Sequence, residues 1–278
     1  MNLESVPIIN QRDKKLFYYL SIFKYLDVKF IHTHIYCHRS KSYCYQRLIQ
    51  LDRHGYLDTA TMYELTSKTE GTVARKVFIN GGNAQEFLSF NLAHNSKIHN
   101  FHDHYINHQI SLANGLVHFD EANLSFEDNN IRVVKMLSEQ ELSISDKKIS
   151  IRPDAGFVLE INKSNILYFV EMERSYAKED DLMRKLVDQY SNISKYITRL
   201  EAIEYYNIQS IRLLFISDDD NKMNNIIFKT SKVLNHNVEI LFTSLPQIAN
   251  HMKNDDNILN LDLKSTSGNL NKLYKKIQ

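Results

Sequence analysis

The chain has 278 residues, of which 43% are hydrophobic and 24% are charged, and its formal net charge is +1. This length suits one large domain or two small ones, and the composition is that of a globular protein with a sizeable core. There are only two cysteines, Cys37 and Cys44, and no apolar run approaches the roughly 20 residues that span a bilayer. We therefore expect neither a disulfide framework nor a membrane span, and we expect a protein of the reducing cytoplasm.

The first part of the chain predicts three helices. Apolar residues recur on one face from Gln11 to Leu26, and Phe30 to Tyr36 forms a short helix or turn. Ser40 is the expected N-cap of a third helix that runs to His54, and Gly55 follows where helices often end.

The third helix is amphipathic. Cys44, Leu48 and Leu51 recur at helical spacing and should face the core. The polar residues expected on its exposed side are Lys41, Gln46, Arg47, Gln50 and Arg53. Because residues 1–60 carry nine Lys/Arg and five Asp/Glu, this side suits a polyanion.

Two short strands follow, Tyr56-Leu57 and Met62 to Leu65, on either side of Asp58 to Thr61. Three helices and then a β-hairpin are the order of a winged helix-turn-helix domain, whose third helix enters the major groove of DNA. There Gln and Arg would read base edges and Lys would contact phosphate. The alternatives are a solvated basic helix or a winged helix that docks another protein. Glycines mark the next stretch as wing and connector, so the first domain is expected to cover residues 1–95.

A second domain is predicted over residues 96–250, where expected helices and strands alternate. Helices are expected from His99 to Phe119, Asp180 to Tyr196 and Asn221 to Asn235, and strands from Ile131 to Leu137, Ile211 to Ser217 and Val238 to Phe242. Together with a central hairpin, these connections indicate a mixed sheet in an α+β or α/β domain. His104 and His108 have the spacing of a metal pair, but without an HExxH pattern a surface cluster is favoured.

The central hairpin carries three carboxylates. Its strands run from Phe157 to Ile161 and from Ile166 to Val170, with turn-forming residues between them. Asp154 precedes the first strand, and Glu171 and Glu173 end the second, so antiparallel pairing brings all three together. Converging carboxylates repel one another and are most easily held by Mg²⁺ or Mn²⁺. The alternative is a solvated strand end.

The layout around Pro153-Asp154 and the acidic strand end resembles the PD-(D/E)XK nuclease superfamily over roughly residues 99–245, with Glu173 in place of the usual lysine. More narrowly, the chain resembles the replication-relaxation family, which includes the MOBC relaxases of mobile plasmids and integrative elements. In that family a winged helix precedes a restriction-endonuclease-like domain with an Asp, a gap and Glu-x-Glu, which Asp154, Glu171 and Glu173 match.

Other stretches carry the same resemblance. The spacing of Lys185, Leu186 and Tyr190 and the stretch from His102 to Asn107 are similar to those of the family. The resemblance implies that Lys185 takes the part of the missing lysine. Arg174 is the second choice, because it directly follows the acidic pair. The resemblance also implies cleavage without a stable tyrosyl link, although Tyr176 and Tyr190 lie near the acidic segment.

The expected function is therefore a metal-dependent DNA strand nickase of relaxase type. The expected metal ligands are Asp154, Glu171 and Glu173, and Lys185 completes the catalytic set. The expected partners are double-stranded DNA at a specific origin and a coupling protein or other relaxosome components. The alternatives are a catalytically inactive DNA-binding protein and a dimeric double-strand endonuclease. Residues 251–278 are expected to form a basic tail outside the domain.

Overall fold

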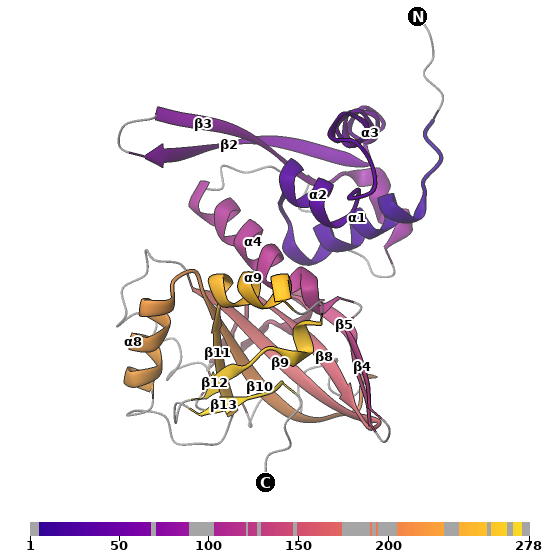
Figure 1. Cartoon of the computed structure of the whole chain (residues 1–278). Coiled ribbons are helices and arrows are strands. Elements are labelled where there is room, and N and C mark those ends of the chain that lie inside the picture. The colour runs from indigo at the N-terminus through magenta and orange to yellow at the C-terminus, as the bar shows by residue number, and fades with distance from the viewer. Residues whose placement is uncertain are drawn as a thin grey trace, which may run out of the picture. The chain divides into compact units, whose positions relative to one another are not determined.

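The computed structural model describes residues 6–67, 71–88, 103–120, 122–126, 129–146, 149–173, 190, 193, 205–230, 239–254, 257–265 and 269–273. The chain forms two compact units, Met1–Asn114 and Gly115–Gln278 (Figure 1). The fold is mixed, with helices and β-sheet in both units, as the sequence predicted.

The first unit holds helices around a three-stranded antiparallel sheet of order β1-β3-β2. Its elements are α1 (Gln11–Phe23), β1 (Leu26–Asp27), α2 (Val28–His34), α3 (Lys41–Arg53), β2 (Leu57–Ser67), β3 (Gly71–Asn80), the 3-10 helix η1 (Gly82–Phe87) and α4 (Asp103–Leu116). Helix α3 begins and ends as predicted, because Ser40 accepts a hydrogen bond from the Tyr43 N–H and Gly55 adopts a φ of +70°.

The hairpin of this unit is longer than the sequence analysis expected. Residues 58–61 do not separate two strands, because β2 runs through them and pairs along its length with β3. The stretch from Gly71, expected as irregular wing and connector, is therefore a regular strand as far as Asn80. Helix α1 also ends earlier than expected, since Lys24 takes a positive φ of 63° and Leu26 pairs with Phe78.

Helix α4 belongs largely to the first unit. Its Ile106 and Ile110 pack in one apolar cluster with Met62 and Val77 of the hairpin. The Lys24 ammonium also donates a hydrogen bond of 2.9 Å to the hydroxyl of Tyr105 on α4. The units thus divide after Asn114, whereas the sequence analysis placed the boundary at 95/96.

The second unit is built on an eight-stranded mixed sheet of order β13-β12-β11-β10-β9-β8-β5-β4. Its elements are η2 (Val117–Phe119), β4 (Asn123–Phe126), β5 (Asn129–Ser138), α5 (Glu139–Leu142), β6 (Ile144–Asp146), β7 (Ile149–Ile151), β8 (Ala155–Ile161), β9 (Ser164–Glu173), β10 (Ile208–Ser217), α8 (Asp220–Thr230), β11 (Glu239–Ser244), α9 (Leu245–Asn254), η6 (Ile258–Asn260), β12 (Leu263–Ser265) and β13 (Leu270–Asn271). Strands β9, β10 and β11 are parallel to one another, and the other pairs in this sheet are antiparallel.

The predicted central hairpin is β8 and β9. Its turn is tighter than expected, because Ile161 pairs with Ser164 and only Asn162 and Lys163 lie between them. Both take a positive φ, of 50° and 66°, as in the two-residue turns whose twist matches that of the strands. Alternate residues of β9 then face opposite sides of the sheet, so Leu167, Phe169 and Glu171 share one side.

One side of the sheet packs against α8. Leu167 and Phe169 of β9 join Leu213 and Phe215 of β10 in a buried cluster, with Met223, Ile226 and Ile227 of α8. Tyr190 and Ile193 also belong to this cluster, although the predicted helix from Asp180 to Tyr196 otherwise lies outside the described residues.

The segment expected as a basic tail is part of this domain. Strand β12 pairs with β11, so Val238 to Phe242 is not the last strand. The backbone carbonyl of Leu273 accepts hydrogen bonds from the Tyr168 hydroxyl and from Nη1 of Arg212, the latter at 2.5 Å. Arg212 is buried and its Nε lies 2.8 Å from Glu239 Oε2. The fold therefore continues to Leu273.

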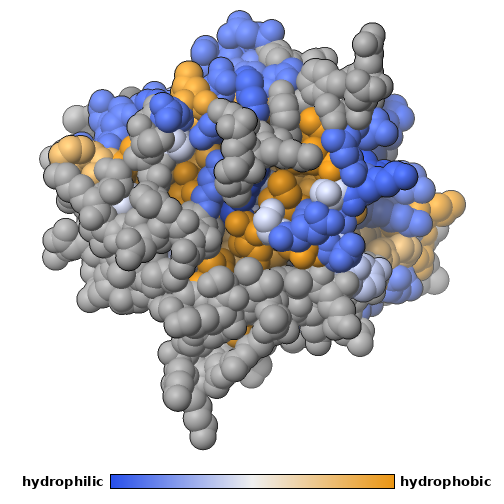
Figure 2. Space-filling view, turned by 90° about the horizontal axis from the view of Figure 1, so that it is seen from below, coloured by the Kyte–Doolittle hydropathy of each residue, from blue (hydrophilic) through white to orange (hydrophobic). Residues whose placement is uncertain are grey.

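Hydrophobic and hydrophilic side chains both reach the surface of the second unit (Figure 2). In the view from below, hydrophobic side chains show between hydrophilic ones (Figure 2). Among the residues of this unit whose burial is described, the large exposed hydrophobic side chains are Val134, Tyr205, Phe228 and Leu270. None of the helices in the described ranges is long and apolar enough to cross a membrane.

Candidate functional site

The three predicted carboxylates lie at one edge of the large sheet, where β8 begins and β9 ends. Ala155 pairs with Val170, which places Asp154 opposite Glu171. Ser217, the last residue of β10, pairs with Glu173. This is the edge at which the parallel strands β9, β10 and β11 have their carboxyl ends, the usual position of sites in open sheets with parallel strands.

Asp154 fixes the end of β9. Its backbone N–H donates to the Val170 carbonyl at 3.0 Å, and its Oδ2 accepts the Met172 N–H at 2.8 Å. One carboxylate oxygen is therefore held against the strand between Glu171 and Glu173. Asp154 thus lies beside the acidic end of β9.

Glu171 is buried, with 3% of its surface exposed. The hydroxyl of Tyr190, which is also buried, donates a hydrogen bond to its Oε1. Burial, and then the negative charge of Glu171, raise the pKa of Tyr190 well above the ordinary value. In this structure the tyrosine is thus a protonated donor to the carboxylate.

Glu173 forms an ion pair that the sequence analysis missed. The Lys222 ammonium lies 2.9 Å from its Oε1, and each side chain is only 12% exposed. Lys222 stands in the first turn of α8, where its backbone N–H is capped by Asp219. The turn between β10 and α8 reaches the site because the Asp218 N–H donates to the Glu173 carbonyl at 3.1 Å. The triple aspartate after β10 was the available signal, but its closeness to Glu173 depends on the order of strands in the sheet.

The carboxylates have the chemistry of a metal site, since Mg²⁺ and Mn²⁺ prefer oxygen ligands. Among the residues that the structure describes, no three His, Cys, Asp or Glu side chains are already arranged to hold a metal ion. Each of the three carboxylates instead has at least one oxygen bound to a protein donor, which is the Met172 N–H, the Tyr190 hydroxyl or the Lys222 ammonium. The donor types therefore fit the metal, and a metal bound at Oε1 of Glu173 would replace the Lys222 ammonium there.

Lys185, Arg174 and Tyr176 lie outside the described residues. His104 is exposed and His108 half-buried on α4, and neither belongs to a metal-ligand set within the described part of the chain.

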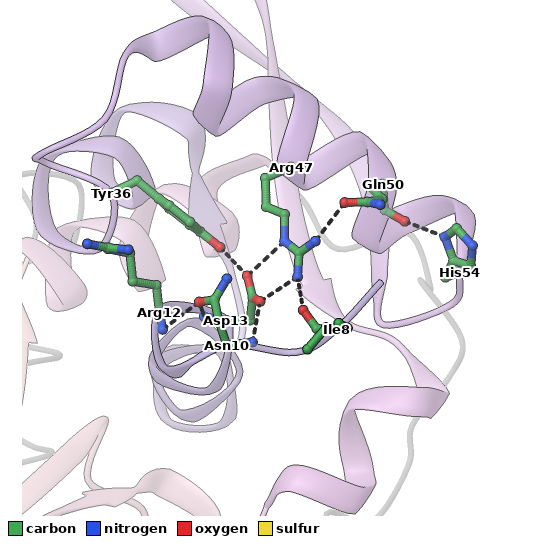
Figure 3. Close-up of polar contacts among 8 residues, drawn as sticks. All are labelled: Ile8, Asn10, Arg12, Asp13, Tyr36, Arg47, Gln50 and His54. Atoms are coloured by element: carbon green, nitrogen blue, oxygen red, sulfur yellow. Dashed lines mark hydrogen bonds and ion pairs between the residues drawn. The ribbon is translucent and has the colours of Figure 1, made fainter. Parts of the chain in front are cut away.

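Helix α3 carries the predicted DNA-contacting residues, some of which are exposed and some of which are partly buried against the first unit. Lys41, Gln46 and Arg53 are exposed, as expected. Arg47 is not: its side chain is 11% exposed and its Nη2 lies 2.6 Å from the fully buried carboxylate of Asp13 (Figure 3). Gln50 accepts a hydrogen bond of 2.6 Å from Arg47. The expected exposure of Arg47 is therefore wrong, because that guanidinium pairs with α1.

Asp13 is the centre of this buried network. It closes a capping box with Asn10 at the start of α1, and the Tyr36 hydroxyl donates to its Oδ1 at 2.6 Å. Arg47 also donates to the Ile8 carbonyl at 2.7 Å. Burial and the charge of Asp13 raise the pKa of Tyr36 above its ordinary value. These contacts join α1, α3 and the segment before α1.

Comparisons with models of protein families, with curated proteins and with solved structures gave no match for this chain.

Proposed function

We propose that the protein is a metal-dependent DNA strand nickase of relaxase type, acting at the transfer or replication origin of a plasmid or integrative element. The observation that carries this proposal is the meeting of Asp154, Glu171 and Glu173 at one sheet edge, with Lys222 beside them. Acidic residues at the ends of adjoining strands can hold a metal ion, and a lysine on the neighbouring helix can neutralise phosphate charge, as phosphodiester hydrolysis needs.

The three carboxylates would hold Mg²⁺ or Mn²⁺. When bound, the metal would supply polarisation of the phosphate and a more acidic attacking water. Lys222 would neutralise charge on the phosphate oxygens, either with Lys185 or in its place. Tyr190 would keep Glu171 in orientation through the hydrogen bond that it donates. Water would add to phosphorus and lose a proton to solvent, the bond to the leaving oxygen would break, and that oxygen would take a proton from solvent.

The first unit would deliver this chemistry to double-stranded DNA. The helices α1, α2 and α3 followed by a long hairpin support a winged-helix domain, and the nuclease-like assignment of the second unit completes the layout of the resembled family. A coupling protein or other relaxosome components would be the protein partners, and the cytoplasm the place of action.

A plasmid-nicking assay tests the proposal. Supercoiled plasmid from the native replicon would be incubated with the protein in Mg²⁺, Mn²⁺ or EDTA. We expect open-circular DNA with either metal and none with EDTA. Glu171→Gln should abolish nicking, whereas the control Glu160→Gln, on the neighbouring strand β8 and paired with Arg132, should nick at the wild-type rate. Nicking that survives in both Glu171→Gln and Asp154→Asn would overturn the metal-site assignment.

A second candidate is a DNA-binding protein without nuclease activity. It is favoured by the protein donors that already engage each carboxylate, above all Lys222 on Glu173. In that case the protein would retard the plasmid on a gel and leave its topology unchanged in every metal. Linear product would instead indicate a double-strand endonuclease.

A further inference from the structure

One face of α3 points away from the body of the first unit. Cys44, Leu48 and Leu51 form its buried side. On the opposite side, at the three- and four-residue spacing of a single helical face, lie Ser42, Tyr45, Gln46, Ile49 and Arg53. Four of these five are exposed and Ile49 is half-buried, so this stripe is the part of α3 that another molecule can reach.

Intramolecular contacts further separate this stripe from the rest of the helix. Arg47 and Gln50 lie on the flank that faces α1, and the ion pair with Asp13 holds them there. Within the described residues, no hydrogen bond ties Tyr45 or Gln46 to other side chains, and Tyr45 is 45% exposed. Gln46 is thus exposed, whereas Gln50, one helical turn further on, is half-buried and accepts a hydrogen bond from Arg47.

The other flank of the stripe meets the hairpin. The Lys76 ammonium of β3 lies 4.0 Å from a carboxylate oxygen of Asp52 on α3. Thr61 pairs with Lys76, and Tyr63 follows two residues later on the same side of β2 with 57% of its surface exposed. Helix and hairpin therefore present adjoining exposed surfaces. Lys41, Arg53 and Lys76 outnumber Asp52 on this combined surface, so its excess positive charge complements a polyanion.

We infer that this surface reads DNA sequence through Gln46 and Tyr45, and that Arg47 and Gln50 take no part in DNA contact. The inference rests on the proposed function, which supplies duplex DNA as the partner. The amide of Gln46 can pair with the N6 and N7 edge of adenine in the major groove. Tyr45 adds contact with the neighbouring base or phosphate, and the lysines of this surface contact phosphate without reading sequence. The recognised site should then contain an essential adenine.

The two glutamines provide a matched test. The full-length protein would first select its preferred site from a random pool of DNA duplexes. Anisotropy would then compare binding to that duplex and to a scrambled one. Gln46→Ala should weaken binding to the selected duplex by roughly 10-fold to 100-fold, the worth of one bidentate base contact, and leave the scrambled duplex almost unaffected. Gln50→Ala should keep the wild-type affinity for both.

Repeating the selection with Gln46→Ala should remove the preference at one base pair, and Tyr45→Ala should weaken binding independently. Wild-type affinity in both Gln46→Ala and Tyr45→Ala would overturn the inference. It would also be overturned if only Gln50→Ala, while still folded, lost affinity for the selected duplex. A protein that nicks plasmid DNA but selects no sequence would overturn this inference alone. A protein that neither nicks nor binds any duplex would overturn the proposed function as well.

Discussion

At the scale of single residues, the side chains of Tyr190 and Lys222 bind the glutamates at the end of β9. Both contact buried or nearly buried glutamates, and both come from outside the β8–β9 hairpin. A carboxylate that is removed from water needs such donors, because an unpaired buried charge is costly. The hairpin therefore determines where the acidic residues lie, and the hydrogen bond from Tyr190 and the ion pair with Lys222 reduce the cost of burying Glu171 and Glu173.

The first prediction concerns Tyr190→Phe. Losing the hydroxyl leaves Oε1 of buried Glu171 without that donor, so the free energy of unfolding should fall by about 1–3 kcal/mol in urea denaturation. Nicking should become slower but persist, with no denaturant-resistant protein–DNA adduct in either protein. Tyr205→Phe is the control, because Tyr205 is 81% exposed and should unfold like the wild type. If Tyr190→Phe cleaved no DNA and the wild-type protein formed a denaturant-resistant adduct with DNA, Tyr190 would instead be the nucleophile.

The second prediction concerns the two thiols. Burial raises the pKa of Cys44 from 9.0 to about 11, whereas Cys37 is exposed. Because the folded-state pKa is the higher one, the stabilisation linked to this thiol is complete below pH 9.0 and is lost as pH rises toward about 11. At about pH 8 iodoacetamide should therefore modify only Cys37 in the native protein and both cysteines in denaturant. Mass spectrometry reads the result, and rapid native labelling of Cys44 would contradict it.

At the scale of elements, α3 is attached to α1 by charge as well as by apolar packing. The fully buried carboxylate of Asp13 accepts hydrogen bonds from the Tyr36 hydroxyl and the Arg47 guanidinium. Such a pair fixes the orientation of one helix relative to the other, and it removes Arg47 from the exposed face. Amphipathic periodicity predicted which residues of α3 face the core, but it could not predict a partner 34 residues earlier in the chain.

The third prediction is that Arg47→Met destabilises the first unit strongly. Methionine keeps much of the apolar volume but leaves the fully buried Asp13 without its cation, a loss of roughly 3–5 kcal/mol. Arg53→Met, on the exposed face of the same helix, should change stability by no more than about 0.5 kcal/mol. Urea unfolding followed by circular dichroism compares the two variants. Equal unfolding midpoints would show that the Asp13–Arg47 pair does not hold α3 in place.

Local signals also decided which other elements were predictable. The cap of α3 at Ser40 and the β8–β9 hairpin depend on neighbouring residues, and both were predicted correctly. The continuation of β2 through residues 58–61 depends on its pairing with β3, which short-range patterns do not contain. Lys222 was missed for the same reason, since only the parallel pairing of β9 with β10 brings α8 to Glu173.

At the scale of the whole molecule, the chain beyond residue 250 completes the second unit. The long apolar runs of β5, β8, β9, β10 and β11 made these strands predictable, but β12 and β13 have only three and two residues. Strands this short show no alternation of apolar and polar residues, so the lysines of this segment led to the prediction of a basic tail. The buried contacts of Leu273 with Tyr168 and Arg212 show that it is held by the sheet.

The fourth prediction compares two leucines of this C-terminal segment. Leu263 of β12 is fully buried, so Leu263→Ala should cost about 2–5 kcal/mol through the cavity that it leaves. Leu270 of β13 is 59% exposed, and Leu270→Ala should change stability by about 0.5 kcal/mol or less. Urea unfolding followed by circular dichroism measures both. A tail that only contacts DNA or a partner would make both substitutions silent for folding, and that outcome would contradict the place of β12 in the sheet. A large effect of Leu263→Ala alone means that truncations in this region test the fold before they test DNA binding.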